Sequence, residues 1–294
     1  MTKQSALRLL FVTNPRSGNG QDNQVAIREH FDGKEHTIDF YLISASCSVE
    51  SIREKISDFR PDRVIAVGGD GTIGLVASCI VGMDIPMGIF PTGSANGLAK
   101  ELGIFPEFAS SMATIEGGNS MKIHLTEING KLCVHLSDIG LNAYAMKKFE
   151  MQDIRGMYGY LIASLKVLWQ NPRMEIEMKV DDQNTRISAE MVVIANASKY
   201  GNGIQINPIG ALDDEFFEVI AIKKISILEI LKMTFAKPSF NVKKTEIFQT
   251  SSLTMRSRKK FHFQIDGEYL GKVKEIKAQL IPAALQILVP EEIK

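Results

Sequence analysis

The chain has 294 residues, 45% hydrophobic and 23% charged, as in soluble globular proteins, and this length is sufficient for two domains. Lysine plus arginine and aspartate plus glutamate number 34 each, so the net charge is zero. This balance excludes a long-range field that would draw the protein to nucleic acid, and an anionic partner must be met by local groups. No apolar stretch reaches the ~20 residues of a membrane span, so we expect a cytoplasmic protein with at most peripheral membrane contact. Cys47, Cys79 and Cys133 lack metal-type spacing, and we expect them to be reduced thiols in the core.

The first part of the chain alternates short apolar runs with segments of helical periodicity. We predict strands at residues 7–12, 36–43, 63–67 and 86–90, and helices at 23–31, 49–56, 73–81 and 95–102, with Ser48 as the N-cap of the second helix. Strands that alternate with helices at this spacing form parallel sheets through right-handed crossovers. Residues 1–118 are therefore predicted to form a Rossmann-like α/β domain.

Three glycine-rich turns, at residues 14–18, 68–72 and 91–97, follow predicted strands of this domain. Glycine lets backbone N–H groups approach a bulky anion, and the N-terminus of a following helix adds a positive end. In parallel α/β sheets, ligands bind at the carboxyl ends of the strands, where all three turns lie. The sequence predicts one phosphate-binding site built from these turns, with Asp70 at the position of a phosphate-bound metal ion.

Beyond residue 118 strand signals dominate, and we place a domain boundary between residues 118 and 119. Predicted strands cover residues 121–128, 132–139, 174–180, 186–195, 217–223, 246–255, 261–265, 273–280 and 285–289. Asn129-Gly130 predicts a type I′ turn between the first two. Helical signals cover residues 142–150, 157–169 and 225–236. So many strands favour an antiparallel β-sandwich or barrel for residues 119–294, and the fold class is α/β plus β.

The chain also contains a set of short motifs that are weak singly and specific together. They are Asn14-Pro15-Arg16-Ser17-Gly18, Gly68-Gly69-Asp70-Gly71-Thr72, residues 91–96, residues 201–203, the stretch with Pro208, Ala211, Asp213 and Asp214, Asp266-Gly267-Glu268, and residues 282–285. In this order and spacing they resemble the diacylglycerol kinase catalytic-domain superfamily, which includes sphingosine kinases and bacterial lipid kinases. The resemblance covers nearly the whole chain. It implies a nucleotide-binding domain at 1–118, a β-rich lipid-substrate domain at 119–294, and an active site in the cleft between them.

The resemblance implies a kinase that uses ATP and Mg²⁺ to phosphorylate the hydroxyl of a diacylglycerol- or sphingoid-like lipid at a membrane surface. The implied nucleotide-binding residues are Asn14, Pro15, Arg16, Ser17, Gly18, Ser44, Gly68, Gly69, Asp70, Gly71, Thr72, Ser94 and Asn96. Asp70 would organise the catalytic Mg²⁺, directly or through water, and Asp266 or Glu268 would take the proton from the lipid hydroxyl. Because phosphoryl transfer depends mainly on positioning and charge neutralisation, these groups would suffice.

At several positions the chain departs from the family pattern. Gly74 and Leu75 replace the usual Asn-Glu after Thr72, Gly97 and His124 stand where bacterial members have Asp, and Glu215 replaces the glycine after Asp214. Asp214 is then a single carboxylate in a weak or vestigial second metal site. We expect no tight Mg²⁺ there without nucleotide, and a direct polar contact of His124, with Asp214 as one candidate partner.

Two other functions stay open: a non-catalytic relative that binds nucleotide or lipid, and an NAD kinase-like enzyme, which shares the Gly-Gly-Asp-Gly-Thr motif. A Rossmann dehydrogenase is disfavoured because no Gly-x-Gly-x-x-Gly follows the first strand. The helix at 157–169 either lines an acyl pocket or packs in the core. The basic run Arg256, Arg258, Lys259 and Lys260 forms either a solvated hairpin tip or a surface facing anionic lipid. The identity of the lipid and the oligomeric state, including a homodimer, are left open, and no nucleic acid partner is expected.

Overall fold

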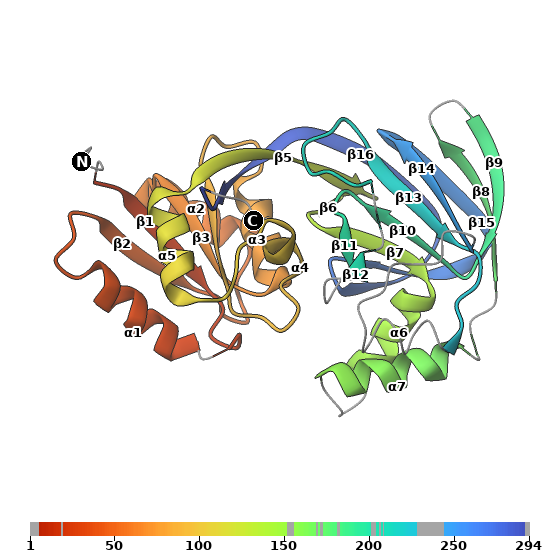
Figure 1. Ribbon diagram of the computed structural model, residues 1–294, viewed down its shortest axis with the longest axis horizontal. Coiled ribbons are helices and arrows are strands. Elements are labelled where there is room, and N and C mark those ends of the chain that lie inside the picture. The colour runs from red at the N-terminus through yellow and green to blue at the C-terminus, as the bar shows by residue number, and fades with distance from the viewer. Residues whose placement is uncertain are drawn as a thin grey trace. The chain divides into compact units, whose positions relative to one another are not determined.

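The computed structural model describes residues 6–18, 20–151, 156–168, 170, 173–180, 183–200, 204–205, 207, 209–227 and 244–291. The chain forms two compact units, with Met1–Ile123 and Ala283–Lys294 in unit 1 and His124–Pro282 in unit 2 (Figure 1). The sequence-based division instead ended the first domain at residue 118 and kept residues 283–294 in the second. The chain returns to unit 1 because the end of its last strand pairs there, with Ile287 parallel to Met87.

Unit 1 is built on parallel strands in the order β4-β3-β1-β2. Its elements are β1 (Arg8–Thr13), α1 (Gly20–Phe31), β2 (Thr37–Leu42), α2 (Val49–Phe59), β3 (Arg63–Gly68), α3 (Asp70–Ile80), β4 (Met87–Pro91), α4 (Gly97–Glu101) and α5 (Phe108–Gly117). The continuous apolar runs of β1, β3 and β4 are almost entirely buried, as expected for parallel strands covered on both faces. The predicted α/β domain is confirmed, and each of its predicted strands and helices is present.

Helix α2 begins at the predicted cap. The Ser51 N–H donates to Ser48 Oγ at 3.2 Å, and the Ser48 N–H donates to Ser51 Oγ at 3.1 Å, which is a reciprocal capping box. Helix α5 was not predicted, because Glu107 precedes it without a side-chain cap. Met112 and Ile115 of α5 join the core around β1 and β3, so packing rather than capping defines this helix.

Unit 2 is dominated by strands, and the strand pairings recorded within it are antiparallel. Its helices are α6 (Leu141–Glu150) and α7 (Gly156–Leu168). Its strands are β5 (Asn119–Ile128), β6 (Lys131–Cys133), β7 (Leu136–Gly140), β8 (Met174–Val180), β9 (Gln183–Ala189), β10 (Met191–Ala195), β11 (Lys199–Tyr200), β12 (Ile204–Gln205), β13 (Phe217–Ile222), β14 (Thr245–Thr250), β15 (Ser252–Ile265) and β16 (Glu268–Val289), of which β5 and β16 extend into unit 1. The predicted antiparallel sandwich is confirmed. Asn129 and Gly130 both have positive φ, as the type I′ turn requires.

Strands β10 and β13 are buried on both faces because one face of the sheet packs against one hydrophobic core and the other face packs against a second core. Val192 and Ile194 of β10 belong to the large cluster between the layers of the sandwich. Val193 belongs to a second cluster, which also contains residues of α6 and α7. These two helices therefore cover the outer face of the sheet (Figure 1). Leu161 and Leu165 of α7 pack against this second core, which favours core packing over an acyl pocket for the helix.

Several predicted strand boundaries in unit 2 are wrong. Residues 252–265 form one strand, so the basic run lies within β15 and is not a hairpin tip. Arg256 pairs there with Glu275 of β16 at 3.1 Å, and the β15–β16 register shifts between Arg256 and Phe261. In the opposite sense, the predicted strand 132–139 is divided into β6 and β7.

Several further expectations concern individual residues. Cys79 and Cys133 are buried as expected, whereas Cys47 is partly exposed. Residues 201–203 and Pro208, and most of the helix expected at 225–236, lie outside the described residues. Among the described residues, no helix has the length and hydropathy needed to cross a membrane.

Candidate functional site

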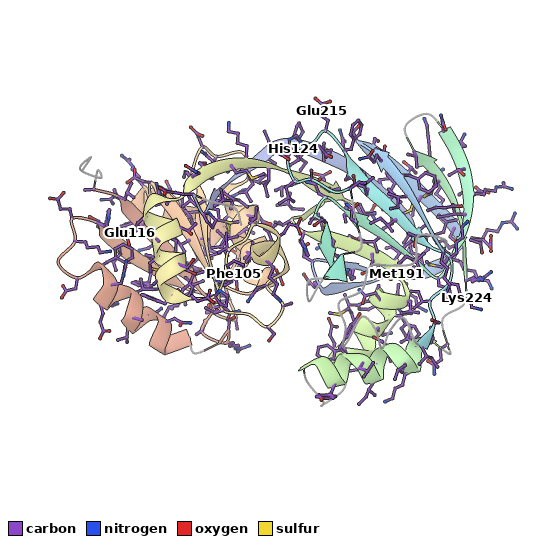
Figure 2. The ribbon with its side chains drawn as sticks, viewed as in Figure 1. Phe105, Glu116, His124, Met191, Glu215 and Lys224 are labelled. Atoms are coloured by element: carbon purple, nitrogen blue, oxygen red, sulfur yellow. The ribbon has the colours of Figure 1, made fainter. Side chains whose placement is uncertain are left out.

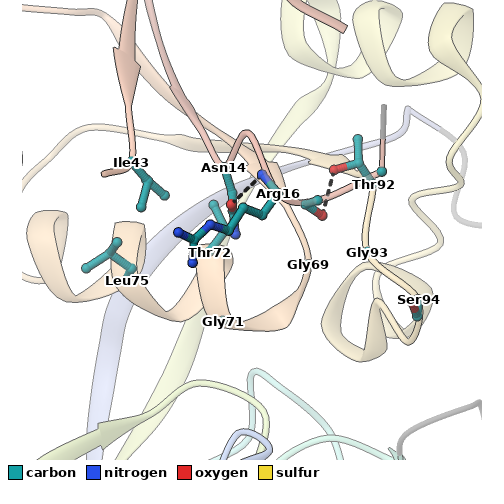
Figure 3. Close-up of a pocket in the computed structure, with 12 residues that line it drawn as sticks. Asn14, Arg16, Ile43, Gly69, Gly71, Thr72, Leu75, Thr92, Gly93 and Ser94 are labelled. Atoms are coloured by element: carbon teal, nitrogen blue, oxygen red, sulfur yellow. Dashed lines mark hydrogen bonds between the residues drawn. The ribbon is translucent and has the colours of Figure 1, made fainter. Parts of the chain in front are cut away.

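The three glycine-rich turns of unit 1 meet at the carboxyl edge of its sheet. The Asn14 N–H donates to the Val67 carbonyl at 3.0 Å, which joins the first turn to β3. The Thr92 N–H donates to the Gly68 carbonyl at 3.0 Å, which joins the third turn to the second. The Thr92 hydroxyl contacts the Ser17 hydroxyl at 3.1 Å (Figure 3). The structure therefore brings together three segments that are distant in sequence.

Glycine is required where the second and third turns touch. A Cβ on Gly93 would lie 2.5 Å from the Gly69 Cα and 2.8 Å from Asn96 Oδ1, closer than atoms can approach. A Cβ on Gly68 would lie 2.2 Å from the Thr72 hydroxyl. Gly93 and Gly69 thus allow the two turns to lie in direct backbone contact, and Gly68 leaves room for the Thr72 side chain within the second turn.

The first turn is ordered by its own asparagine. The Arg16 N–H donates to Asn14 Oδ1 at 3.0 Å, and the Ser17 N–H donates to the Asn14 carbonyl at 3.1 Å. Gly18 closes the turn with a φ of 57°, in the left-handed region. The side chain of Arg16 is left exposed, where it can meet an anion, and Pro15 is exposed beside it.

A cavity of about 400 Å³ lies over these turns (Figure 3). It is lined by Asn14, Arg16, Ser17, Gly18, Ile43, Gly69, Gly71, Thr72, Leu75, Thr92, Gly93 and Ser94. Eight of these are among the nucleotide-binding residues implied by the resemblance, and Thr92 and Gly93 lie in the predicted third turn, whereas Ile43 and Leu75 were not predicted. Figure 3 shows Ile43 and Leu75 at one end of the cavity and the glycine turns at the other. The cavity thus has an apolar end and an end lined by backbone N–H groups and hydroxyls.

Five predicted nucleotide-binding residues do not line this cavity. Pro15, Gly68 and Asn96 shape the turns, and the Asn96 amide donates to the Gly93 carbonyl at 2.7 Å. Ser44 follows Ile43 and is exposed, with its hydroxyl 3.0 Å from that of Ser46. Asp70 is the fifth residue.

Asp70 occupies the first position of α3, directly after the N-cap Gly69. Its Oδ1 accepts the N–H of Leu98 at 3.4 Å, so the carboxylate lies between the N-terminal ends of α3 and α4. Among the described residues, no group of three or more His, Cys, Asp or Glu side chains could hold a metal ion. A single carboxylate fits Mg²⁺ only when phosphate oxygens and water supply the other ligands.

The second candidate site lies in unit 2, in the two-residue turn that joins β15 to β16. Ile265 pairs with Glu268 across this turn, and the intervening Asp266 and Gly267 have φ values of 46° and 86°. Two positive φ angles are the signature of a type I′ hairpin turn. The Asp-Gly-Glu motif is therefore a tight hairpin that presents Glu268 in an exposed position at the start of β16.

The Asp266 carboxylate is engaged by backbone donors. Its Oδ1 accepts the N–H groups of His135 at 2.9 Å and Leu136 at 3.0 Å, and its Oδ2 accepts the Val134 N–H at 2.8 Å. Burial raises the pKa of the Asp266 carboxyl, and the N–H groups of Val134 and His135 oppose this shift. With both oxygens occupied, this carboxylate is arranged to hold the segment before β7. Glu268, in contrast, is exposed.

Among the described residues, the His124 side chain has no contact with Asp214, the candidate partner named above. The backbone N–H of His124, which is labelled in Figure 2, donates to the Leu212 carbonyl at 2.8 Å. Nδ1 of the His124 ring is buried without a hydrogen-bond partner among the described residues. Asp214 accepts the Phe216 N–H at 3.2 Å instead. Among the described residues, the His124 ring therefore does not take the place of the missing aspartate beside Asp214.

Comparison with known proteins identifies the family. The diacylglycerol kinase catalytic domain matches residues 8–128, and the YegS C-terminal NAD kinase beta sandwich-like domain matches residues 137–289. The chain belongs to the diacylglycerol kinase catalytic-domain superfamily. The predicted resemblance is confirmed over nearly the whole sequence.

Individual relatives agree with this assignment. A diacylglycerol kinase of Staphylococcus epidermidis is 22% identical, over 75% of this chain and 72% of that protein. The crystal structure of a diacylglycerol kinase from Bacillus anthracis superposes over the whole of both chains with a TM-score of 0.72 and 18% identity. The crystal structure of an NAD kinase from Archaeoglobus fulgidus in complex with ATP covers 97% of this chain and 94% of that chain, with a TM-score of 0.57 and 14% identity. The fold is therefore shared with both kinds of kinase, and more closely with the first.

Proposed function

We propose that the protein is an ATP-dependent lipid kinase that transfers the γ-phosphoryl group to the hydroxyl of a diacylglycerol- or sphingoid-like lipid. The observation that carries this proposal is the cavity over the three glycine turns. Its volume of about 400 Å³ falls within the ~300–1,000 Å³ typical of small-molecule sites. Its two ends differ in polarity, as a nucleoside triphosphate does.

The polar end suits the phosphates. The N-terminus of α3 points into the turns, and no side chain caps it, so its first N–H groups can meet an anion. Arg16 and the hydroxyls of Ser17, Thr72 and Ser94 also line the cavity. Ile43 and Leu75 suit the flat, apolar face of the base, and Leu75 performs this role at a position where the family usually carries a glutamate.

The residues around this cavity could supply only part of the ligand set of a Mg²⁺ ion. Asp70 supplies one carboxylate beside the helix N-termini, and the nucleotide phosphates would supply further oxygens. When bound, Mg²⁺ neutralises negative charge on the transferring phosphoryl group. Asp70 would orient the complex of Mg²⁺ and nucleotide because its carboxylate attracts the positively charged ion.

In unit 2, Glu268 is the group we assign as acceptor of the proton from the lipid hydroxyl. It is exposed, and the hairpin turn fixes its backbone. Asp266 supports this turn through the N–H groups of Val134, His135 and Leu136 and would not act as the base. The names of the matching domain and relatives support a lipid as the acceptor, presented to the enzyme at a membrane surface.

The proposal is tested by incubating the protein with γ-labelled ATP, Mg²⁺ and a panel of diacylglycerol, sphingoid bases, phosphatidylglycerol and NAD. We expect label in one lipid and none in NAD. Label in NAD alone would favour an NAD kinase-like enzyme. ATP binding without transfer to any acceptor would favour a non-catalytic relative, consistent with the loss of the Asn-Glu pair at Gly74 and Leu75.

A further inference from the structure

A chain of buried and partly buried polar side chains runs from helix α7 to the hairpin turn that carries Glu268. The Tyr160 hydroxyl donates to Asn142 Oδ1, and Asn142 Nδ2 donates to Asp138 Oδ2 at 2.5 Å. Gln264 Nε2 donates to the same Asp138 oxygen at 2.5 Å. Gln264 Oε1 accepts the N–H of Gly267 at 2.7 Å. We call Tyr160, Asn142, Asp138 and Gln264 the buried polar chain.

Its central groups have little contact with solvent. Asp138 is 0% exposed, Gln264 1% and Asn142 4%. Asp138 and Gln264 lie opposite one another in the β7–β15 pairing, and Asn142 is four residues after Asp138, on α6. Buried polar groups without partners are unfavourable by about 1–3 kcal/mol each, so such side chains persist where their hydrogen bonds are made.

The direction of every bond in the chain is determined. The Gly267 N–H can only donate, so the carbonyl oxygen of Gln264 must face it and the amide nitrogen must face Asp138. At the other end, burial and the negative charge of Asp138 raise the pKa of the Tyr160 hydroxyl, which keeps its proton. Donors therefore converge from both sides on one carboxylate, which in its ionised form accepts hydrogen bonds and cannot donate them. The chain has a single hydrogen-bonding arrangement.

The turn needs this support because Asp266 is not glycine and yet has a φ of 46°. A left-handed conformation is unfavourable for a residue with a Cβ and persists where neighbouring contacts impose it. Two sets of hydrogen bonds impose it here. The backbone N–H groups of residues 134–136 donate to the Asp266 carboxylate, and the Gly267 N–H donates to the side-chain oxygen of Gln264.

We propose that Asp138, Asn142 and Gln264 are positioning residues for catalysis, which hold the Asp266-Gly267 turn so that Glu268 is presented to the acceptor hydroxyl. This inference rests on the proposed function of Glu268 and lies outside the family motifs. None of the three residues touches substrate in this account. Tyr160 fixes the orientation of Asn142 and contributes less.

A reciprocal exchange tests the proposal. Gln264→Glu replaces the donor that faces Asp138 with a second carboxylate, and we expect kcat to fall by at least ~10-fold, with the KM for ATP changed by less than ~2-fold. Asp138→Asn with Gln264→Glu restores complementarity, because the amide introduced at position 138 donates to the carboxylate introduced at position 264 and to a reoriented Asn142, while Tyr160 accepts. We expect the double variant to recover kcat to within ~3-fold of wild type, the sign of direct coupling.

Glu218→Gln is the matched control. Glu218 is also a fully buried carboxylate of unit 2, and it accepts Asn207 Nδ2 at 2.5 Å and Gln249 Nε2 at 3.0 Å, but it has no bond to the turn. We expect its kcat to stay within ~2-fold of wild type. Unchanged kcat in Gln264→Glu, no recovery in the double variant, or an equal loss in Glu218→Gln would overturn the proposal.

Hydrogen–deuterium exchange of the free protein separates this inference from the proposed function. We expect Gln264→Met to raise the exchange rate of the Gly267 N–H by at least ~10-fold, because its acceptor is lost, while the amides of β10 keep their wild-type rates. This result is independent of any kinase activity. Unchanged exchange at Gly267 would show that the chain does not hold the turn, whereas faster exchange in a protein that phosphorylates no lipid would contradict the proposed function alone.

Discussion

His262 is predicted to make the stability of the protein depend on pH below 7. Its ring stacks on Tyr144 with centroids 4.1 Å apart and planes inclined by 6°, and its Nδ1 lies 2.7 Å from the Tyr269 hydroxyl. Burial and the nearby ammonium groups of Lys272, Lys147 and Lys148 lower its pKa from 6.5 to about 4. The imidazole is therefore neutral in the folded protein at pH values where it is already protonated in the unfolded chain.

The magnitude follows from proton linkage. Between pH 6.5 and about 4 the unfolded state binds a proton that the folded state does not, so stability is complete above pH 6.5 and is lost as the pH falls. The full shift corresponds to about 3 kcal/mol, of which some 2 kcal/mol would be lost between pH 7 and pH 5. Solvent screening of the three lysines reduces this to about 1–2 kcal/mol.

The assay compares melting temperatures of wild type and His262→Phe between pH 7 and pH 5. Phenylalanine keeps the stack on Tyr144 but cannot be protonated, so the wild type should lose about 2–6 °C relative to the variant over this range. Lys147→Gln with Lys148→Gln should diminish the effect, because it removes two of the charges that lower the pKa of His262. Parallel curves for wild type and His262→Phe would refute this reasoning.

Three further predictions concern the candidate sites. Gly93→Ala places a Cβ 2.5 Å from the backbone of the second turn and should destabilise the protein by about 1–3 kcal/mol in a denaturant titration, whereas Gly71→Ala meets nothing within 4 Å and should leave stability unchanged. Asp70→Asn should abolish phosphoryl transfer with an unchanged melting temperature, and activity within a few-fold of wild type would remove Asp70 from the mechanism. Glu268→Gln should lower kcat by ~10²-fold or more without loss of stability, whereas Asp266→Asn should lower the melting temperature as well, and the reverse pattern would exchange their roles.

The architecture of unit 1 could be predicted because its signals are local. The strand predicted at residues 63–67 has a continuous apolar run at residues 64–67, and the capping box at Ser48 is formed by residues three apart. Helix α5 was missed because its defining contacts, such as those of Ile115 with β1 and β3, join residues far apart in sequence. The basic run of β15 was misread for the same reason: Glu275, the partner of Arg256, lies on another strand.

The same distinction between local signals and contacts distant in sequence applies to the candidate site. That the three turns would meet followed from the rule that ligands bind at the carboxyl ends of parallel strands. The apolar end of the cavity could not be foreseen, because Leu75 reaches it only through the direction of α3. The sequence also left Asp266 and Glu268 equivalent, since the backbone donors to Asp266 come from residues more than a hundred positions earlier.

In the proposed reaction, ATP bound in the cavity of unit 1 supplies a phosphoryl group to a lipid hydroxyl. The most direct measurement is mass spectrometry of the lipid recovered after incubation with ATP, Mg²⁺ and diacylglycerol or a sphingoid base in mixed micelles, with Gly93→Ala and Glu268→Gln in parallel. We expect a phosphorylated lipid with wild type and a large loss of product with each variant. A wild-type protein that binds ATP but yields no phosphorylated lipid, or a Glu268→Gln variant with undiminished product, would contradict it.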